Sequence, residues 1–457
     1  MTAVSTPAGA LSDADRNWRR FVLFRVLFNS RFYYPVLAVL FLDLGLTPSE
    51  YTLLNFAWAI AIVFTDLPAG VLADRIGRKP LVVSSAIFMI LEMALLAIAP
   101  RNGGIALLVC CFGNRILSGM AEGMASGADE ALVFDSLAER GRSAEWPSVL
   151  EQVVRWQGVG LVIAMLVGGA VYDPIFMGRL SSALGFKFHF DQGLTLRFPI
   201  YLNLVTALIT LWTALGLREP GTRARQCVPG DEGASGAEMT AWHLVKTAGT
   251  WIVKTPAALF VIVAGVLIDS VSRLFLTFSS TYFRIIDLPE ATFGIIGAAL
   301  GLLSLVVSPM ARRMVTRNSM TKNYLLLGVM ALAGLTGAAV RWHYWGLAFV
   351  IPIWGAMMAL DYIVSYYLNN LVDSSHRATV LSFNGVAVNL GYGFISLLFA
   401  LALKAVRNGG STQEAVARGF ALLPPWLLFA AILCAIAFRR QYRRLSVIPP
   451  AAEAAAP

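Results

Sequence analysis

Twelve long apolar stretches separated by short polar segments dominate the pattern of residues along the chain. A helix needs about 20 mostly apolar residues to cross the roughly 30 Å hydrocarbon core of a bilayer, and every stretch is of about that length or longer. The predicted spans are 21–42, 51–73, 80–99, 105–134, 150–171, 198–217, 257–284, 291–311, 323–340, 345–371, 379–404 and 419–438. The pattern predicts an all-α integral membrane protein with twelve transmembrane helices.

A polar connection at 218–256 separates the spans into two groups of six. Its first part, REPGTRARQCVPGDEGASG, is rich in glycine, proline and charge, which is typical of a linker. We therefore expect two six-helix bundles, 21–217 and 257–438, joined by this linker and flanked by tails at 1–20 and 439–457.

Composition and charge support the membrane prediction and set its orientation. The 457 residues are 57% hydrophobic and only 14% charged, against about 25% charged in soluble domains, which leaves no room for a sizeable soluble domain. Of the 36 lysines and arginines, 22 lie on the side of the two termini, nine on the opposite side and five within spans. By the positive-inside rule both termini are cytoplasmic, in a cytoplasmic or inner membrane. The net charge of +9 thus serves topology, and we expect no nucleic acid partner.

The N-terminal tail has no apolar core before the first span, so an uncleaved first helix is expected rather than a signal peptide. Four cysteines and four histidines are scattered without metal-ligand spacing, so no metal site is expected. The sequence also lacks a nucleotide-binding loop or a nucleophile constellation. We expect neither a cofactor nor an enzymatic activity such as ATP hydrolysis.

Residues 70–81, GVLADRIGRKPL, place three cations, one anion and two glycines between two apolar spans. This composition indicates a cytoplasmic loop between membrane helices. Its spacing resembles the loop signature of the major facilitator superfamily, a large group of secondary transporters. The matching gating-loop residues are Gly70, Asp74, Arg75, Gly77, Arg78 and Lys79. The corresponding segment of the second bundle, 308–317, keeps a proline and cations but lacks the acid and the glycines.

This resemblance implies two pseudo-symmetric halves that alternate access to a substrate held between them at mid-membrane. It also implies that the loop latches the inner ends of the halves together. Asp74 could meet the positive end of the span that follows Arg377. The loop cations could meet Asp129, Glu130 and Asp135. The alternative is that these charges only set topology.

Span 105–134 carries a polar stripe, which is informative because an ionisable group inside a membrane is costly unless it faces a partner or water. Its polar residues step by three or four along one helical face. Arg115-x-x-Ser118-Gly119 resembles a second superfamily motif, Arg-x-x-Gln-Gly, whose arginine is associated with proton coupling; serine replaces the glutamine here. The proton-coupling and gating candidates are Arg115, Glu122, Asp129, Asp135 and Asp66. Alternatively, Arg115 only bonds backbone carbonyls.

Other intramembrane polar residues suggest a substrate cavity. The candidates are Arg31, Tyr34, Asp269, Arg273, Asp361, Ser365 and Asn369. Asp269 and Arg273 are spaced as an i, i+4 pair, which could be a ligand site or an internal ion pair that makes insertion tolerable. Glu92, with methionines nearby, is expected to sit in an apolar shell and remain protonated and inert.

Taken with the resemblance, these features predict a secondary transporter of a small organic solute, most simply by proton-coupled efflux. Span 150–171 departs from many proton-driven exporters, because it lacks their Gly-Pro-x-x-Gly-Gly element. An importer or facilitator of the same fold, and a receptor that kept the fold without transport, are the alternatives. The expected partners are the solute and the lipid bilayer, and the expected state is a monomer.

Overall fold

The structure is a computed structural model that describes residues 13–101, 103–219, 249–372, 377–406 and 411–441. All regular elements in these ranges are helices. Most of the predicted linker (220–248) and most of each predicted tail (1–12 and 442–457) lie outside the described residues.

The first half of the described chain, from α1 to α10, begins at Asp13. It contains α1 (Asp13–Asn29), η1 (Tyr34–Val36), α2 (Leu37–Leu44), α3 (Pro48–Ile76), α4 (Arg78–Ile98), α5 (Ile105–Ala125), α6 (Ala128–Ala138), η2 (Ser143–Glu145), α7 (Trp146–Tyr172), α8 (Pro174–Ala183), α9 (Gln192–Thr195) and α10 (Phe198–Leu215).

The second half, from α12 to α20, follows the linker. It contains α12 (Pro256–Thr277), α13 (Ser279–Ile285), α14 (Glu290–Leu302), α15 (Ser304–Arg317), α16 (Met320–Ala339), α17 (Leu347–Leu371), α18 (Arg377–Val406), α19 (Thr412–Phe420) and α20 (Leu423–Ala437).

Eleven helical segments of the described chain are long and apolar enough to cross a membrane. They correspond to the second to twelfth predicted spans. The first predicted span, 21–42, is not one helix, and for this reason it is absent from that count. With its two pieces, α1 and α2, the described chain makes the twelve crossings that the apolar pattern predicts, and the all-α membrane fold is confirmed.

The break in the first span lies between α1 and η1. Pro35 has no backbone N–H and disfavours helical backbone in the residue before it, so a continuous helix is disrupted here. A backbone group that the break leaves without a helical partner bonds to a side chain instead: the N–H of Phe32 donates to Asn203 Oδ1 on α10 at 3.0 Å. The sequence prediction of one unbroken helix was therefore wrong at this point.

A second break divides the polar span 105–134 into α5 and α6. Gly127 adopts a φ of 71°, in the left-handed region that residues with a side chain rarely occupy. The break separates α6, with its acidic first turn, from α5. The acids of this span therefore do not share one straight helical face, as the sequence had suggested.

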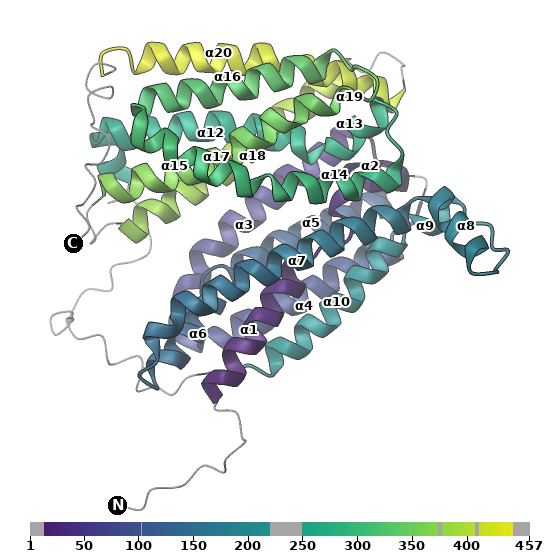
Figure 1. The fold of residues 1–457 in the computed structure, drawn as a ribbon, viewed down its shortest axis with the longest axis horizontal. Helices are drawn as coiled ribbons and strands as arrows, with labels where there is room; N and C mark the ends of the chain where they lie inside the picture. The colour runs from purple at the N-terminus through teal and green to yellow at the C-terminus, as the bar shows by residue number, and fades with distance from the viewer. Residues whose placement is uncertain (1–12, 102, 220–248, 373–376, 407–410, 442–457) are drawn as a thin grey trace, which may run out of the picture.

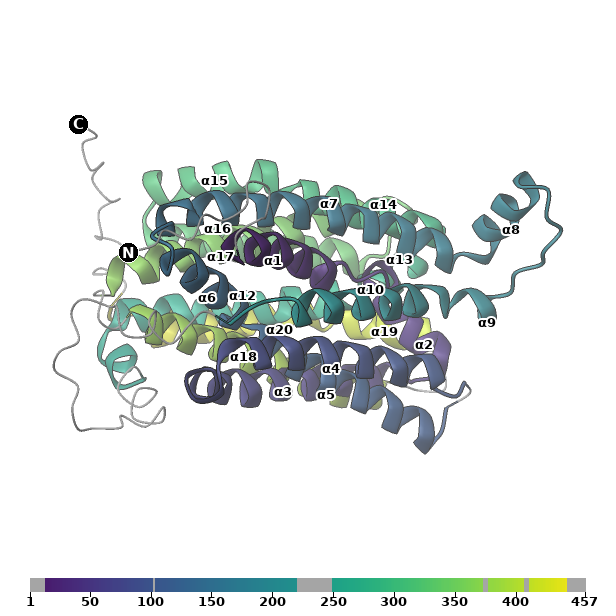
Figure 2. The ribbon, with the colours of Figure 1, turned by 90° about the horizontal axis from the view of Figure 1, so that it is seen from below.

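The two halves form two helical bundles that approach at one end and diverge at the other (Figure 1). We call the end where α1 begins and α20 ends the terminal end, and the opposite end the distal end. The bundles meet at the distal end, near α2, α13 and α14, and α8 projects beyond it (Figures 1 and 2).

Two helix pairs make the main contact between the halves: α3 with α18, and α7 with α14. The second pair depends on small residues. A Cβ added to Gly169 of α7 would lie 2.7 Å from the backbone nitrogen of Gly294 on α14, closer than such atoms can approach. Glycine at both positions thus permits backbone contact between the halves, as in other closely packed membrane helices.

Candidate functional site

A row of four side chains crosses the contact between the halves. The guanidinium of Arg115 on α5 lies 5.5 Å from the ring centre of Trp58 on α3. The guanidinium of Arg273 on α12 lies 5.6 Å from the ring centre of Tyr392 on α18. The two rings meet edge to face, with centres 6.4 Å apart. One cation from each half is thus held by a cation–π contact on either side of the α3–α18 contact.

The two cations of this row differ in how their charge is balanced. Arg273 donates to Asp269 Oδ1 at 2.9 Å, one turn away on the same helix, as the sequence spacing predicted. Arg115 is only 7% exposed, yet no carboxylate among the described residues lies within ion-pair distance of it. Its one described hydrogen bond is a long one, 3.4 Å, to Asn55 Oδ1. A buried cation without an anion is costly, so Arg115 is a functional candidate on physical grounds.

Arg31 and Glu92 form an ion pair in which both side chains are fully buried. Arg31 follows the break after α1, and Glu92 lies on α4. The expectation that Glu92 sits in an apolar shell was wrong, because the break brings this arginine to it. Arg31 was also a cavity candidate, but in this conformation it is covered, with its guanidinium 5.2 Å from the ring centre of Phe28.

A charge network joins the halves at the distal end. Asp43, on α2, accepts hydrogen bonds from both terminal nitrogens of Arg284 on α13, at 2.7 and 2.8 Å. The hydroxyl of Tyr172 on α7 donates to the same carboxylate at 2.6 Å, and Arg284 also pairs with Glu290. About a fifth of the Asp43 and Arg284 side chains is exposed (21% and 23%), so the pair is largely shielded from solvent.

Uncharged groups reinforce this distal contact. The hydroxyl oxygen of Ser280 on α13 accepts from the backbone N–H of Ala38 in the first turn of α2, at 3.1 Å. The hydroxyl of Tyr51 on α3 donates to the carbonyl of Thr277 at the end of α12, also at 3.1 Å. These bonds satisfy groups that the ends of α2 and α12 leave unpaired.

Asp173, just after α7, completes the distal contact. One carboxylate oxygen caps α8, and the other accepts from the N–H of Ala291 in the first turn of α14 at 3.1 Å. These hydrogen bonds and ion pairs between the halves all lie at the distal end. Sequence reasoning missed this network. The sequence contained one clue to this network. The first span of each half ends in a charged residue, Asp43 in the first half and Arg284 in the second, and the two charges are opposite.

The second half contains a small polar cavity of about 120 Å³ between α12, α17 and α18. It brings together three residues that the sequence had marked as cavity candidates, Asp269, Asp361 and Ser365, and adds Asn384 from α18. Asn369, one turn beyond Ser365, donates to the backbone carbonyl of Ser365 at 2.8 Å. The carboxylates of α12 and α17 therefore face a common space next to the Arg273 end of the row.

The sequence profile of the Major Facilitator Superfamily matches residues 21–396. The chain belongs to this superfamily. The match runs from the first helix into α18 and covers most of the chain. Membership makes the protein an integral multi-pass membrane protein of a transporter family, with a small-molecule substrate, and the superfamily is not one of enzymes.

Solved structures of transporters share the fold at low sequence identity. The nucleoside transporter NupG is 13% identical, with a TM-score of 0.69 over 95% of this chain and 100% of that one. A bacterial homologue of the human lysosomal transporter Spinster, inward-facing and unoccupied, is 16% identical, with a TM-score of 0.66 over 95% and 99%. A bacterial homologue of the human peptide transporters PepT1 and PepT2 is 14% identical, with a TM-score of 0.60 over 95% and 100%. No curated protein sequence matches the chain.

The superfamily loop between α3 and α4 lies at the terminal end. Arg78 pairs with Asp135 on α6 and donates to the carbonyl of Ala131 at 2.6 Å. The backbone N–H groups of Arg78 and Lys79 donate to the carboxylate of Glu219 at 2.9 and 2.7 Å. Glu219, just after α10, thus caps the positive N-terminus of α4. Sequence reasoning had placed Glu219 in the linker and assigned it no role.

The other predicted contacts of the superfamily loop are either absent or involve side chains that the structure does not describe. Asp129 and Glu130 were expected to meet the loop cations, but both accept instead from Arg25 on α1, at 2.8 and 2.6 Å. The reason is that α6, which begins after the break at Gly127, packs against α1. Arg75 is exposed, and a Cβ added to Gly70 would meet nothing within 4 Å. The side chains of Asp74 and Arg377 lie outside the described part of the structure.

The first half contains three further residues that the sequence had marked as candidates for proton coupling, gating or the substrate cavity. Glu122 follows Arg115 by two helical turns on α5, about 10 Å along the axis. Its carboxylate interacts electrostatically with Arg31 and Arg115 and makes no side-chain hydrogen bond to any described residue. Tyr34 is 38% exposed beside the break. Asp66 is half-buried on α3, where that helix packs against α5.

Proposed function

We propose that this chain is a secondary active transporter that exports a small organic solute by alternating access, in exchange for protons. The two bundles are the moving units, and the chain acts as a monomer in a cytoplasmic or inner membrane. The terminal end faces the cytoplasm, since 22 of the 36 lysines and arginines lie on that side.

The observation that carries the proposal is the asymmetry of the contact between the halves. Asp43, Arg284, Ser280 and Asp173 hold the halves together at the distal end, while the bundles diverge at the terminal end (Figure 1). Alternating access requires a second state in which this seal is open and the other end is closed. With the terminal end in the cytoplasm, the conformation described is inward-open.

Proton coupling is supported by the charges of α5. Arg115 is buried without a carboxylate partner among the described residues. Glu122 lies two turns closer to the terminal end, and its carboxylate makes no hydrogen bond to any described residue. A change in the protonation of Glu122 alters the field at Arg115 and so biases the equilibrium between the two states. The solute binds between this helix and the polar cavity of α12 and α17.

A solute screen followed by flux measurements tests the function. Compounds that raise the thermal stability of the purified protein are candidate solutes, because a ligand of the folded state stabilises it. In reconstituted vesicles, an acidic lumen should drive solute uptake above the level without a gradient. Arg115→Gln should abolish this gradient-driven part, because it removes the buried cation.

Arg155→Gln is the matched control, since Arg155 is an exposed cation on α7 that pairs with Glu151 one turn away, and it should transport as the wild type does. If an acidic exterior drives uptake instead, the protein imports the solute together with protons, and the export proposal is wrong. Gradient-driven uptake by Arg115→Gln at the wild-type rate would rule out a coupling role for Arg115.

We also propose that the superfamily loop latches the terminal end when the distal seal opens. Asp74, on the last turns of α3, then meets the N-terminus of α18, and the loop cation Arg78 stays anchored to Asp135. Asp74→Asn should slow vesicle flux strongly while leaving insertion and folding normal, as judged by yield and a monodisperse elution profile. Glu145→Gln, which removes an exposed i, i+3 partner of Arg142 on the same side, is the control. Wild-type flux in Asp74→Asn would contradict the latch.

A further inference from the structure

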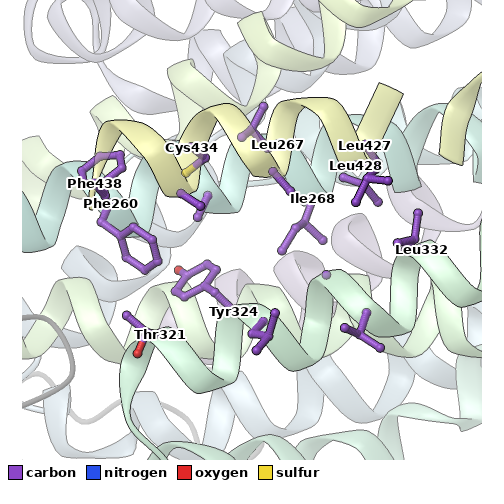
Figure 3. Close-up of a pocket in the computed structure, with 16 residues that line it drawn as sticks. Phe260, Leu267, Ile268, Thr321, Tyr324, Leu332, Leu427, Leu428, Cys434 and Phe438 are labelled. Atoms are coloured by element: carbon purple, nitrogen blue, oxygen red, sulfur yellow. The ribbon is translucent and has the colours of Figure 1, made fainter. Parts of the chain in front are cut away.

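The second half carries an apolar groove that the transport proposal does not use. It has a volume of about 280 Å³ and lies between α12, α16 and α20 (Figure 3). Leucine, valine, alanine and aromatic side chains make up nearly all of its lining. α16 and α20 form its two walls and α12 its floor, away from the contact with the first half (Figures 1 and 3).

The groove is as long as one leaflet is deep. On α16 its lining runs from Thr321 to Leu332, and on α20 from Phe438 to Leu427. Eleven residues of helix rise about 16 Å, and one leaflet contributes about 15 Å of a 30 Å hydrocarbon core. Both walls therefore extend from the terminal-end surface of the membrane to its middle, which is the path of a single acyl chain.

Aromatic rings line the groove at its terminal end. The rings of Tyr324 and Phe438 each pack edge to face against Phe260, with centres 5.3 Å apart in both pairs. The hydroxyl of Tyr324 donates to the carbonyl of Val261 at 3.1 Å, so it needs no partner from a ligand. The surface left open is hydrocarbon, and it suits an apolar chain better than a polar solute.

Exposed cations stand at the terminal-end mouth of the groove. Lys322 directly follows the lining residue Thr321, and Arg439 and Arg440 directly follow Phe438. All three are exposed. Basic residues at the membrane surface attract anionic lipid headgroups. The groove therefore combines a chain-length apolar track with a cationic site at its headgroup end.

We propose that this groove binds one acyl chain of an anionic phospholipid from the leaflet at the terminal end, with its headgroup held by Lys322, Arg439 and Arg440. The bound lipid joins α16 and α20 to α12 along the outer face of the second half. This site is separate from the solute path, so it does not depend on the transport proposal.

Gly328 provides the test of the acyl-chain track. It lines the groove on α16, and a Cβ added there would meet nothing within 4 Å, so a large side chain fills the groove without a clash in the protein. Replacing a helical glycine also favours the helix. Gly328→Leu should weaken retention of phosphatidylglycerol by about tenfold, measured by native mass spectrometry after extraction from phosphatidylglycerol nanodiscs.

Gly158→Leu on α7 is the matched control, because an added Cβ there also meets nothing within 4 Å and the position is outside the groove. It should retain lipid as the wild type does. Arg439→Gln with Arg440→Gln should keep the bound lipid but lose the preference for phosphatidylglycerol over phosphatidylcholine. Equal lipid retention by Gly328→Leu and the wild type would overturn the proposal, and so would an equal preference for both lipids in the wild type.

Discussion

Arg31→Met should destabilise the protein by about 3 to 5 kcal/mol, because removing one partner of a buried ion pair leaves the other as an uncompensated charge. Both side chains of the Arg31–Glu92 pair have no exposed surface, and the pair fixes the break between α1 and η1 against α4. Reversible unfolding in mixed micelles of sodium dodecyl sulfate measures the loss. Glu92→Met should be destabilising for the same reason.

The double variant separates an ion pair from two independent packing residues. A pair of apolar side chains of similar volume often replaces a buried ion pair with little loss, so Arg31→Met with Glu92→Met should recover most of the stability. Glu151→Gln removes an exposed partner of Arg155 and should change the stability by less than about 1 kcal/mol. Additive losses in the double variant would show that the two charges do not depend on each other.

Asp43→Asn should open the distal end. The variant removes the carboxylate charge that pairs with Arg284 across the halves and accepts from Tyr172 within the first half. Breaking such a pair costs about 2 to 5 kcal/mol, and the lower value applies because about a fifth of each side chain is exposed. A loss of about 2 kcal/mol shifts the ratio of the two states by roughly 30-fold.

A buried reporter measures this shift without a known solute. Ala38 is fully buried beneath the seal on α2. Ala38→Cys, in a background with the four native cysteines replaced, should react faster with a membrane-impermeant maleimide added from the distal side once Asp43→Asn is present. Glu414→Gln removes an exposed i, i+4 partner of Arg418 within the second half and should leave labelling unchanged. Equal labelling in Asp43→Asn and the reporter background would contradict a sealing role for this network.

Sequence reasoning predicted site contacts between residues that are close together in the sequence. The Asp269–Arg273 pair follows from i, i+4 spacing on one helix, and the structure contains it. The pairing of Arg78 with Asp135 was expected because the loop resembles that of the superfamily, although the residues are 57 positions apart. Asp129 was misassigned, because α6 packs against α1 after the break at Gly127 and Asp129 pairs there with Arg25.

The sequence by itself determined the twelve apolar crossings, the polar linker between two groups of six and the superfamily loop, because membrane insertion depends on local hydrophobicity and length. Only the tertiary structure decided which charges are paired. Arg31 meets Glu92 across 61 positions and Asp43 meets Arg284 across 241. It also decided that Arg115 is buried without a carboxylate partner among the described residues. Ion pairing depends on distance and shielding in space, and these are set by helix breaks and packing between helices that no single stretch of sequence contains.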